Sequence, residues 1–361
     1  MVSACVNGKV TLTRIQDLTR KDSRPSSSNS QKKKENRREI DGQDDIASVA
    51  FLVDGEHIVS GGKENKIRRW QVKDGKEVGK PMDAGNIVYS IATTQEWIVA
   101  GMKGGQVTAW ATVDRGRDTK TIEFKGHGIA VNAVDISQDA MKIATGSDDM
   151  TVRIWSLSTG QQLLGPLKHD YCVVATKFSP DGRLVATATW QRDSIRIYDT
   201  QDGCRLFDFP VQVGCFNNQS LAWTGDKKHL FALSYDGAIH CLDVSTGTTL
   251  SNWAIWTGDD GPGCIALANN GMFIATSTKT SVSFWDTTTY QQIGSGIHHP
   301  NEVDCMAMSA NYALVLGGHK KITLWDLSEV LPSSHFSRVG VSLSKPRCVK
   351  PRTYYKPPFC L

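Results

Sequence analysis

The 361-residue chain is 40% hydrophobic and 22% charged, an ordinary balance for a globular protein with a sizeable core. Its net charge of +4 is uneven: residues 1–40 sum to +6, residues 333–361 to +6, and residues 41–332 to −8. This distribution excludes a nucleic-acid-binding core and confines any polyanion binding to the two ends. No apolar run approaches the roughly eighteen residues that a membrane span needs, which predicts a soluble protein.

The first forty residues predict one strand and one linker. Residues 10–15 alternate between apolar and polar side chains, as a β-strand does. Within the segment 1–19 they form either an extra strand that closes the last repeat described below or a remnant of an incomplete repeat. Residues 20–40 combine a Ser-rich stretch with the basic cluster 32–38, which predicts a disordered basic linker. The cluster is either a nuclear-import signal or simply solvated.

Residues 41–332 contain a repeat of 40 to 45 residues, marked each time by a large residue at the end of a short alternating strand. This period is typical of four-stranded propeller blades and is too long for ankyrin or tetratricopeptide repeats. Because such strands cannot bury both faces alone, the units must stack around an axis. The pattern predicts an all-β fold, a single seven-bladed β-propeller of four-stranded antiparallel blades. The seven markers are Trp70, Trp110, Trp155, Tyr198, Leu242, Trp285 and Trp325.

The third repeat shows the local pattern most clearly. Alternating residues predict strands over Val131–Ile136, Lys142–Gly146 and Thr151–Trp155, and a Thr-Gly turn then opens a fourth strand. The segment 333–361 is basic and contains several prolines, so we expect a mostly disordered tail. The nine cysteines are scattered and form no C-x-x-C pair, which predicts free thiols in a reducing, cytoplasmic or nuclear compartment.

These repeats resemble the WD repeats of the WD40 β-propeller family, and the resemblance covers residues 41–332. The Trp-Asp pair stands at Trp285-Asp286 and Trp325-Asp326, and the Gly-His pair that opens a repeat stands at Gly126-His127. Residues 51–62 and 178–183 are similar to fungal WD40 repeat-like proteins. The resemblance implies a ring that binds other proteins.

The third repeat also matches the buried hydrogen-bond tetrad of that family, through His127, Thr145, Asp149 and Trp155. A buried indole N–H needs an acceptor, which the hydroxyl supplies, while imidazole and carboxylate hold the hydroxyl in place. The resemblance therefore implies a structural network, and we do not expect the histidine and aspartate to be a catalytic pair. Few other repeats keep the aspartate, so packed apolar layers are expected to carry most of the stability.

In this family, the loops before the first strand and between the second and third strands ring the narrow face, where partners commonly dock. A tryptophan beside an arginine, as at Trp190 and Arg192, has the composition of an interface hot spot. Alternatively, this tryptophan folds back and caps the fourth blade. Carried onto this sequence, the candidate partner-binding face includes Lys63, Lys103, Asp148, Trp190, Arg192, Tyr235, Lys279, His319 and Lys320.

Catalytic motifs are missing from the sequence: it has no phosphate-binding loop, nucleophile elbow, zinc-protease motif or EF-hand loop. The acid pairs Asp148-Asp149 and Asp259-Asp260 are more typical of solvated turns than of metal ligands. We therefore expect no enzyme, no cofactor and no metal.

The leading hypothesis is a non-enzymatic scaffold or adaptor that binds proteins or peptides, as a monomer within a larger complex. One alternative is a substrate receptor of a ubiquitin ligase, although the Trp-Asp-x-Arg motif of such receptors is absent. Another is a stand-alone relative of the sensing propeller of fungal NACHT-type immune switches, although the phosphate-binding loop of those switches is absent too.

Overall fold

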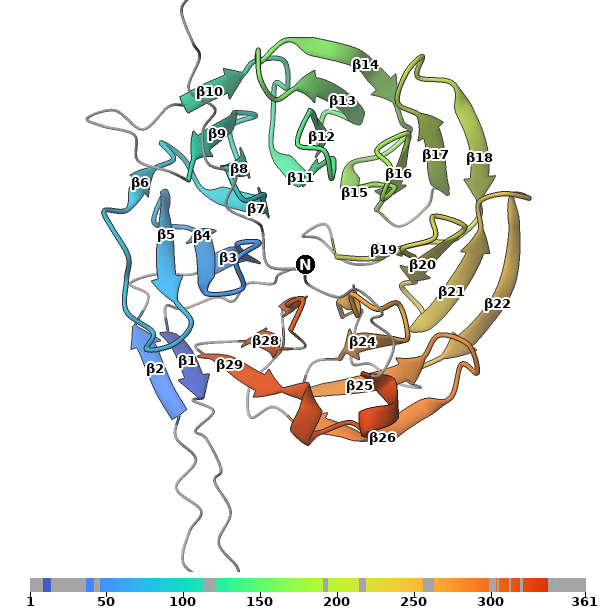
Figure 1. Cartoon of the computed structure of the whole chain (residues 1–361). Helices are drawn as coiled ribbons and strands as arrows, with labels where there is room; N and C mark the ends of the chain where they lie inside the picture. Colours follow the sequence, from blue (N-terminus) through green and yellow to red (C-terminus); the bar gives the residue numbers. More distant parts are fainter. Residues whose placement is uncertain are drawn as a thin grey trace, which may run out of the picture.

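The chain forms a closed ring of β-sheets (Figure 1). At its centre lies a channel whose lining residues come from every sheet. The computed structural model describes residues 9–13, 37–41, 46–112, 121–190, 194–213, 219–255, 263–278, 280–298, 303, 305–311, 313–318 and 321–336. Within these residues the strands form seven sheets, which we number as blades 1 to 7 in chain order. Helical structure in the described part is limited to two 3-10 turns, and no helix there is long and apolar enough to cross a membrane.

Blades 1 to 6 place their strands in sequence order from the channel outward, and so do the first three strands of blade 7. The innermost strands are β3 (Ile46–Phe51), β7 (Val88–Thr93), β11 (Val131–Ile136), β15 (Val173–Phe178), β19 (Leu221–Trp223), β23 (Ile265–Leu267) and β27 (Cys305–Met308). The second strands are β4 (His57–Gly62), β8 (Trp97–Met102), β12 (Lys142–Ser147), β16 (Leu184–Thr189), β20 (His229–Leu233), β24 (Phe273–Ser277) and β28 (Ala313–Gly318). Because β27 contacts β3, the ring closes on itself.

The third strands carry the seven repeat markers, as the sequence predicts. They are β5 (Lys66–Gln71), β9 (Val107–Ala111), β13 (Thr151–Ser156), β17 (Ile195–Asp199), β21 (Ala238–Asp243), β25 (Ser281–Asp286) and β29 (Lys321–Asp326). Blades 1 to 6 end in an outer fourth strand: β6 (Met82–Asp83), β10 (Thr121–Phe124), β14 (Gln162–Lys168), β18 (Arg205–Phe209), β22 (Thr248–Ala254) and β26 (Gln292–His298). The all-β propeller and the four-stranded antiparallel blade are therefore confirmed for six sheets.

Blade 7 differs from the prediction. It has five strands in the order β2-β1-β29-β28-β27, and β1 (Lys9–Thr13) runs parallel to β29. After β29 the chain turns into η1 (Leu327–Glu329), because Asp326 caps that turn by accepting a 2.8 Å hydrogen bond from the Ser328 N–H. The chain thus supplies no fourth strand at this point. The prediction that all seven blades are four-stranded and antiparallel is wrong for this one sheet.

The segments before and after the repeats also differ in detail from the predicted domain bounds. The segment 20–40, predicted as a disordered linker, ends within β2 (Arg37–Asp41), which pairs antiparallel with β1. The segment 333–361, predicted as a disordered tail, begins with η2 (Ser333–His335), and Phe336 packs edge-on against Phe273 at 6.1 Å. Residues 14–36 and 337–361 lie outside the described residues.

The core lies between blades rather than within one of them. Each apolar cluster joins residues of neighbouring blades, as where Val99 and Val107 of blade 2 pack with Val131 and Ile143 of blade 3. Both faces of the inner strands are therefore buried, and apolar side chains on both faces are removed from water. This continuous packing fixes where the loops at the two ends of the channel lie.

Glycines near the ends of second strands allow this close packing. A Cβ atom built on Gly101 would lie 2.5 Å from Cγ1 of Val131 on the next blade, and one on Gly146 would lie 2.5 Å from Cγ1 of Val173. Neither glycine has a positive φ, so the requirement is steric.

The variant Gly101→Val is expected to lower the free energy of unfolding by about 1–3 kcal/mol, because it overpacks the layer between blades 2 and 3. Urea unfolding followed by circular dichroism measures the loss. A Cβ atom on Gly128 meets no atom within 4 Å, so Gly128→Val is the matched control and should change stability little. Equal effects of the two variants would contradict the steric account.

Candidate functional site

The structure joins the four tetrad residues of blade 3 by hydrogen bonds. The Trp155 Nε1–H donates to Thr145 Oγ1 at 2.8 Å, and Thr145 Oγ1 lies 2.7 Å from His127 Nε2. The other ring nitrogen, His127 Nδ1, lies 2.8 Å from Asp149 Oδ2. The chain of bonds runs from the surface turn into the core and ends on a buried indole.

Burial fixes the protonation of this network. It lowers the pKa of His127, and the bond to Asp149 only partly offsets that effect, so the imidazole is neutral at pH 7. Burial raises the pKa of Asp149, but bonds from Thr151 and His127 lower it by more, so this group is a carboxylate. A carboxylate can only accept, so the proton lies on Nδ1 and Nε2 accepts from the Thr145 hydroxyl. Every polar group in the network then has its partner, which indicates a structural role.

The predicted partner-binding face is only partly within the described residues. Lys63, Lys103, Asp148, Trp190 and Tyr235 lie in the turns between the second and third strands of blades 1 to 5, and all of these turns are at the same end of the ring. The remaining four predicted residues, Arg192, Lys279, His319 and Lys320, lie outside the described residues.

Backbone and thiol contacts join the turns of blades 3 and 4 into one surface. The Cys172 Sγ lies 3.8 Å from the carbonyl oxygen of Asp148, and the His169 N–H donates to the Met150 carbonyl at 2.8 Å. The Trp190 N–H in turn donates to the Cys172 carbonyl at 3.1 Å. The loop that leads into β15 is thus held between the turns of its own blade and the preceding one.

The same surface continues onto blade 5. Val213, just before that blade, forms a bridge with Trp190 on one side and with Ser234 on the other. Next to it, the Tyr235 N–H donates to the Gln212 carbonyl at 2.8 Å. The backbones of the two aromatic residues are therefore fixed to one shared connection.

Five large apolar or aromatic side chains lie along this surface, each between 36% and 54% exposed. Trp190 is the least exposed of them, so it neither caps its blade completely nor stands free of it. Sequence reasoning named two of the five and missed three, although all three lie in loops of the kinds that define the predicted face. We call these five side chains, Ile129, Met150, Tyr171, Trp190 and Tyr235, the blade 3–5 arc.

Comparison with known proteins identifies the repeat. The family model described as WD domain, G-beta repeat, matches residues 34–71 and 118–156, which include the third strands of blades 1 and 3. The small ribosomal subunit protein RACK1y of Oryza sativa subsp. japonica is 32% identical over 157 residues, covering 41% of this chain and 44% of that protein. The chain is a WD-repeat β-propeller.

Two further relatives match longer stretches of the chain. The guanine nucleotide-binding protein subunit beta of Arabidopsis thaliana is 26% identical over 212 residues, which cover 55% of this chain and 52% of that protein. WD repeat-containing protein 1 of Rattus norvegicus is 27% identical over 236 residues, which cover 61% of this chain and 37% of that protein. The alignments therefore span about half or less of each of these relatives. The similarity to fungal proteins stays a prediction.

Two other blades of this chain hold part of the tetrad, which was not predicted from the sequence. The Trp70 Nε1–H of blade 1 donates to Ser60 Oγ at 2.8 Å, and the Trp285 Nε1–H of blade 6 donates to Thr276 Oγ1 at 2.9 Å. A Ser or Thr nine or ten residues before the marker tryptophan is the signal for this bond. The hydroxyl-to-indole contact therefore recurs where the histidine and aspartate do not.

Blade 1 replaces the rest of the network by ion pairs. Arg68 Nε lies 2.8 Å from a Glu64 carboxylate oxygen, and Arg68 Nη1 lies 2.8 Å from Glu77. Arg68 is buried, so both carboxylates contribute to keeping its charge satisfied. The position where the family has aspartate is thus used here to hold an arginine.

Blade 4 has a histidine, His169, at the position that corresponds to His127 of blade 3. His169 Nε2 lies 2.9 Å from Thr187 Oγ1, and Nδ1 lies 3.1 Å from the Leu167 carbonyl. A carbonyl can only accept, so Nδ1 carries the proton of the neutral ring. Burial, helped by the charge of Arg196, lowers the pKa of His169 to about 4.

The depressed pKa of His169 predicts a loss of stability in acid. The unfolded chain takes up its proton near the ordinary histidine pKa of about 6.5, whereas the folded chain does so only near pH 4. The contribution of His169 to the free energy of unfolding is therefore fully present above about pH 6.5, and up to about 3 kcal/mol of it is lost as the pH drops to 4. Urea unfolding at pH 7, 5.5 and 4.5 should show a smaller decline for His169→Gln than for the unmodified chain. An identical decline would contradict the assignment.

Proposed function

We propose that the chain is a non-enzymatic scaffold or adaptor that binds another protein through the blade 3–5 arc. The observation that carries this proposal is the continuity of the arc: five partly exposed large side chains on turns that backbone contacts hold together. Single exposed apolar residues are ordinary on a protein surface, but a contiguous group on a rigid support is typical of interaction sites. The rigid ring supplies that support.

The names of two relatives are consistent with this proposal. One is named as a protein of the small ribosomal subunit and the other as a subunit of a guanine nucleotide-binding protein, so each is by name a part of an assembly. We extend only the general property, membership of a complex, to this chain. A cytoplasmic or nuclear location and a monomeric state within the complex belong to the same proposal.

The charges near the arc indicate the chemistry of the partner. Asp148, Asp170 and Asp236 lie in the same loops and turns as the arc. Asp170 is paired with Arg196 at 2.6 Å, so the negative charge available to a partner is that of Asp148 and of the exposed Asp236. A partner segment that combines apolar or aromatic side chains with lysine or arginine would complement this surface. Since His127 and Asp149 are fully used in the tetrad, we propose no catalytic role for them.

The proposal is tested by affinity purification of the tagged full chain from a lysate of its source cells, with the co-purifying proteins identified and compared between variants. Trp190→Ala combined with Tyr235→Ala should lose specific partners without a change in melting temperature. The control is Leu163→Ala combined with Leu206→Ala, because these leucines are also exposed but lie on the outer strands β14 and β18. Retention of every partner by the arc variant would refute the proposal.

A further inference from the structure

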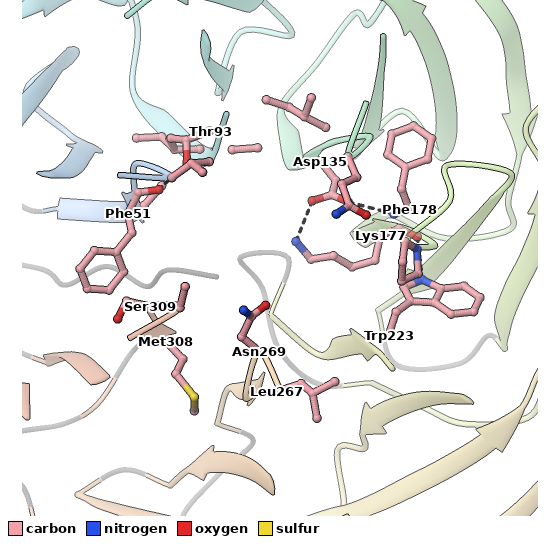
Figure 2. A pocket seen from close by; sticks show the side chains of 18 of the residues that line it. Phe51, Thr93, Asp135, Lys177, Phe178, Trp223, Leu267, Asn269, Met308 and Ser309 are labelled. Atoms are coloured by element: carbon pink, nitrogen blue, oxygen red, sulfur yellow. Dashed lines mark hydrogen bonds and ion pairs between the residues drawn. The ribbon is translucent and has the colours of Figure 1, made fainter. Parts of the chain in front are cut away.

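The end of the channel opposite the arc opens into a cavity of about 600 Å³, a size that suits a small ligand or a short peptide segment. Residues from all seven blades line it, most of them at the carboxyl ends of the inner strands and in the turns that follow. The arc lies on loops that precede the inner strands and on turns between the second and third strands, which are at the other end of the ring, so the two surfaces face opposite ways. Figure 2 shows Phe51, Asp135, Asn269 and Ser309 around the opening.

One ion pair lies in the wall of the cavity. Lys177 Nζ on β15 is 2.9 Å from Asp135 Oδ1 on β11, and the Phe178 N–H donates to Asp135 Oδ2 at 2.9 Å (Figure 2). The two side chains are 12% and 17% exposed, respectively. Sequence reasoning missed this pair, because its members belong to different blades.

The pair leaves hydrogen-bonding capacity directed at the cavity. An ammonium group has three N–H donors, and among the described residues Lys177 Nζ has one acceptor, Asp135. Each carboxylate oxygen of Asp135 can accept a second bond as well. A donor and an acceptor are therefore available side by side, on a site whose charges already cancel.

The rim of the cavity adds no charge. The rim residues are uncharged, and the acidic residues Asp139 and Asp181, one position farther along, already have partners. Asp139 accepts from the Ser137 hydroxyl of its own turn at 2.6 Å, and Asp181 accepts from Lys227 Nζ of the neighbouring blade at 2.7 Å. An anion at the mouth would compete with Asp135 for Lys177, and a cation would compete with Lys177 for Asp135. The rim consists of Val53, Gln138, Pro180, Gly225, Asn269 and Ala310.

An uncharged amide suits this site better than a sugar does. An amide carries one donor and one acceptor next to each other, which complements the donor and acceptor of the ion pair. Sugars bind best against an open aromatic face, but Phe51, Phe178 and Trp223 are all buried. The Trp223 indole N–H is also already used, since it donates to the Lys177 carbonyl at 3.0 Å.

We propose that the channel mouth binds an uncharged segment of a partner protein through an amide group that accepts from Lys177 and donates to Asp135. The proposal rests on the proposed function only in taking a protein as the ligand, because it uses the opposite face of the ring. With two faces occupied, one ring holds two proteins at once.

The test is saturation-transfer difference NMR of the full chain with a capped tripeptide, N-acetyl-Gly-Asn-Gly-amide, as the probe. Versions with a central Asp or Lys and the sugar cellotriose are the competing probes. The uncharged peptide should bind at least about tenfold more tightly than the others, since the loss of one charge-assisted hydrogen bond has an effect of about that size. Absence of binding by the uncharged peptide, or stronger binding of a charged peptide or of cellotriose, overturns the proposal.

Variants locate the binding and separate it from the arc. Asn269→Trp should block the mouth, and Asp135→Asn combined with Lys177→Met should remove the ion pair without leaving an unpaired charge; both should abolish the signal. Glu96→Trp is the matched control, because Glu96 is exposed in a turn at the same end of the ring but does not line the cavity. The arc variant Trp190→Ala with Tyr235→Ala should bind the peptide normally. Unchanged binding by both mouth variants overturns the proposal and leaves the function of the arc untouched.

Discussion

Replacing Trp155 by alanine should lower the free energy of unfolding by about 3–5 kcal/mol, the usual cost of removing a large aromatic side chain from a core. Trp155 is 2% exposed and packs edge-on against Phe124 with 5.9 Å between ring centroids. The substitution leaves a cavity between blades and also removes the N–H that Thr145 accepts. Urea unfolding monitored by far-ultraviolet circular dichroism measures the change, since the signal does not depend on the lost indole.

Phenylalanine at the same position separates packing from hydrogen bonding. Trp155→Phe keeps much of the ring volume but leaves the tetrad without its indole donor, so about 1–3 kcal/mol should be lost. In Trp325, by contrast, the buried Nε1–H has no hydrogen-bond partner in the described part of the chain, so Trp325→Phe should have a much smaller effect. Equal losses in the two phenylalanine variants would show that the tetrad bond does not stabilise blade 3.

The regular part of the fold was predictable because its signals are local. The strand Val131–Ile136 was predicted residue for residue, since alternation of apolar side chains and the flanking turns are both properties of adjacent residues. Trp155 could likewise be placed in a third strand and paired with Thr145 from the repeat alone. Spacing along one blade is sufficient for such contacts.

Features that depend on contacts between distant segments were not predictable. The alternation of residues 10–15 left two alternatives open, an extra strand on the last repeat and a remnant of an incomplete repeat. The structure pairs β1 with β29, and neither the parallel direction of that pairing nor the edge that η1 leaves open follows from a local pattern. The ion pair between Asp135 and Lys177 joins positions 42 residues apart on neighbouring blades. Its members look like ordinary surface charges in the sequence, and only the stacking of β11 beside β15 brings them into the channel wall.

The arc was predictable in location but not in membership. The narrow-face loops follow from the repeat, and Trp190 and Tyr235 stand out there as large aromatic residues in polar turns. Ile129 and Met150 do not stand out, because whether an apolar residue in a loop folds inward or outward is decided by its neighbours. Met150 also has a left-handed backbone conformation, with φ of 61°, which no sequence pattern predicts.

Lys177→Met is expected to lower the free energy of unfolding by roughly 3 kcal/mol, near the low end of the range for breaking a buried ion pair, because both groups keep some exposure. The substitution retains the length and apolar stem of the side chain but leaves the Asp135 carboxylate without its cation. That carboxylate cannot move out to solvent freely, since it accepts the Phe178 N–H on the next blade.

The second substitution Asp135→Asn, added to Lys177→Met, should restore most of the lost stability. Asparagine is neutral, so it needs no cation, and its carbonyl oxygen can still accept from Phe178. Urea unfolding of the two single variants, the double variant and the unmodified chain forms a double-mutant cycle, which isolates the coupling between the two side chains. Additive losses would show that the two charges do not stabilise each other, and the account of the cavity wall as a neutral, paired site would then be wrong.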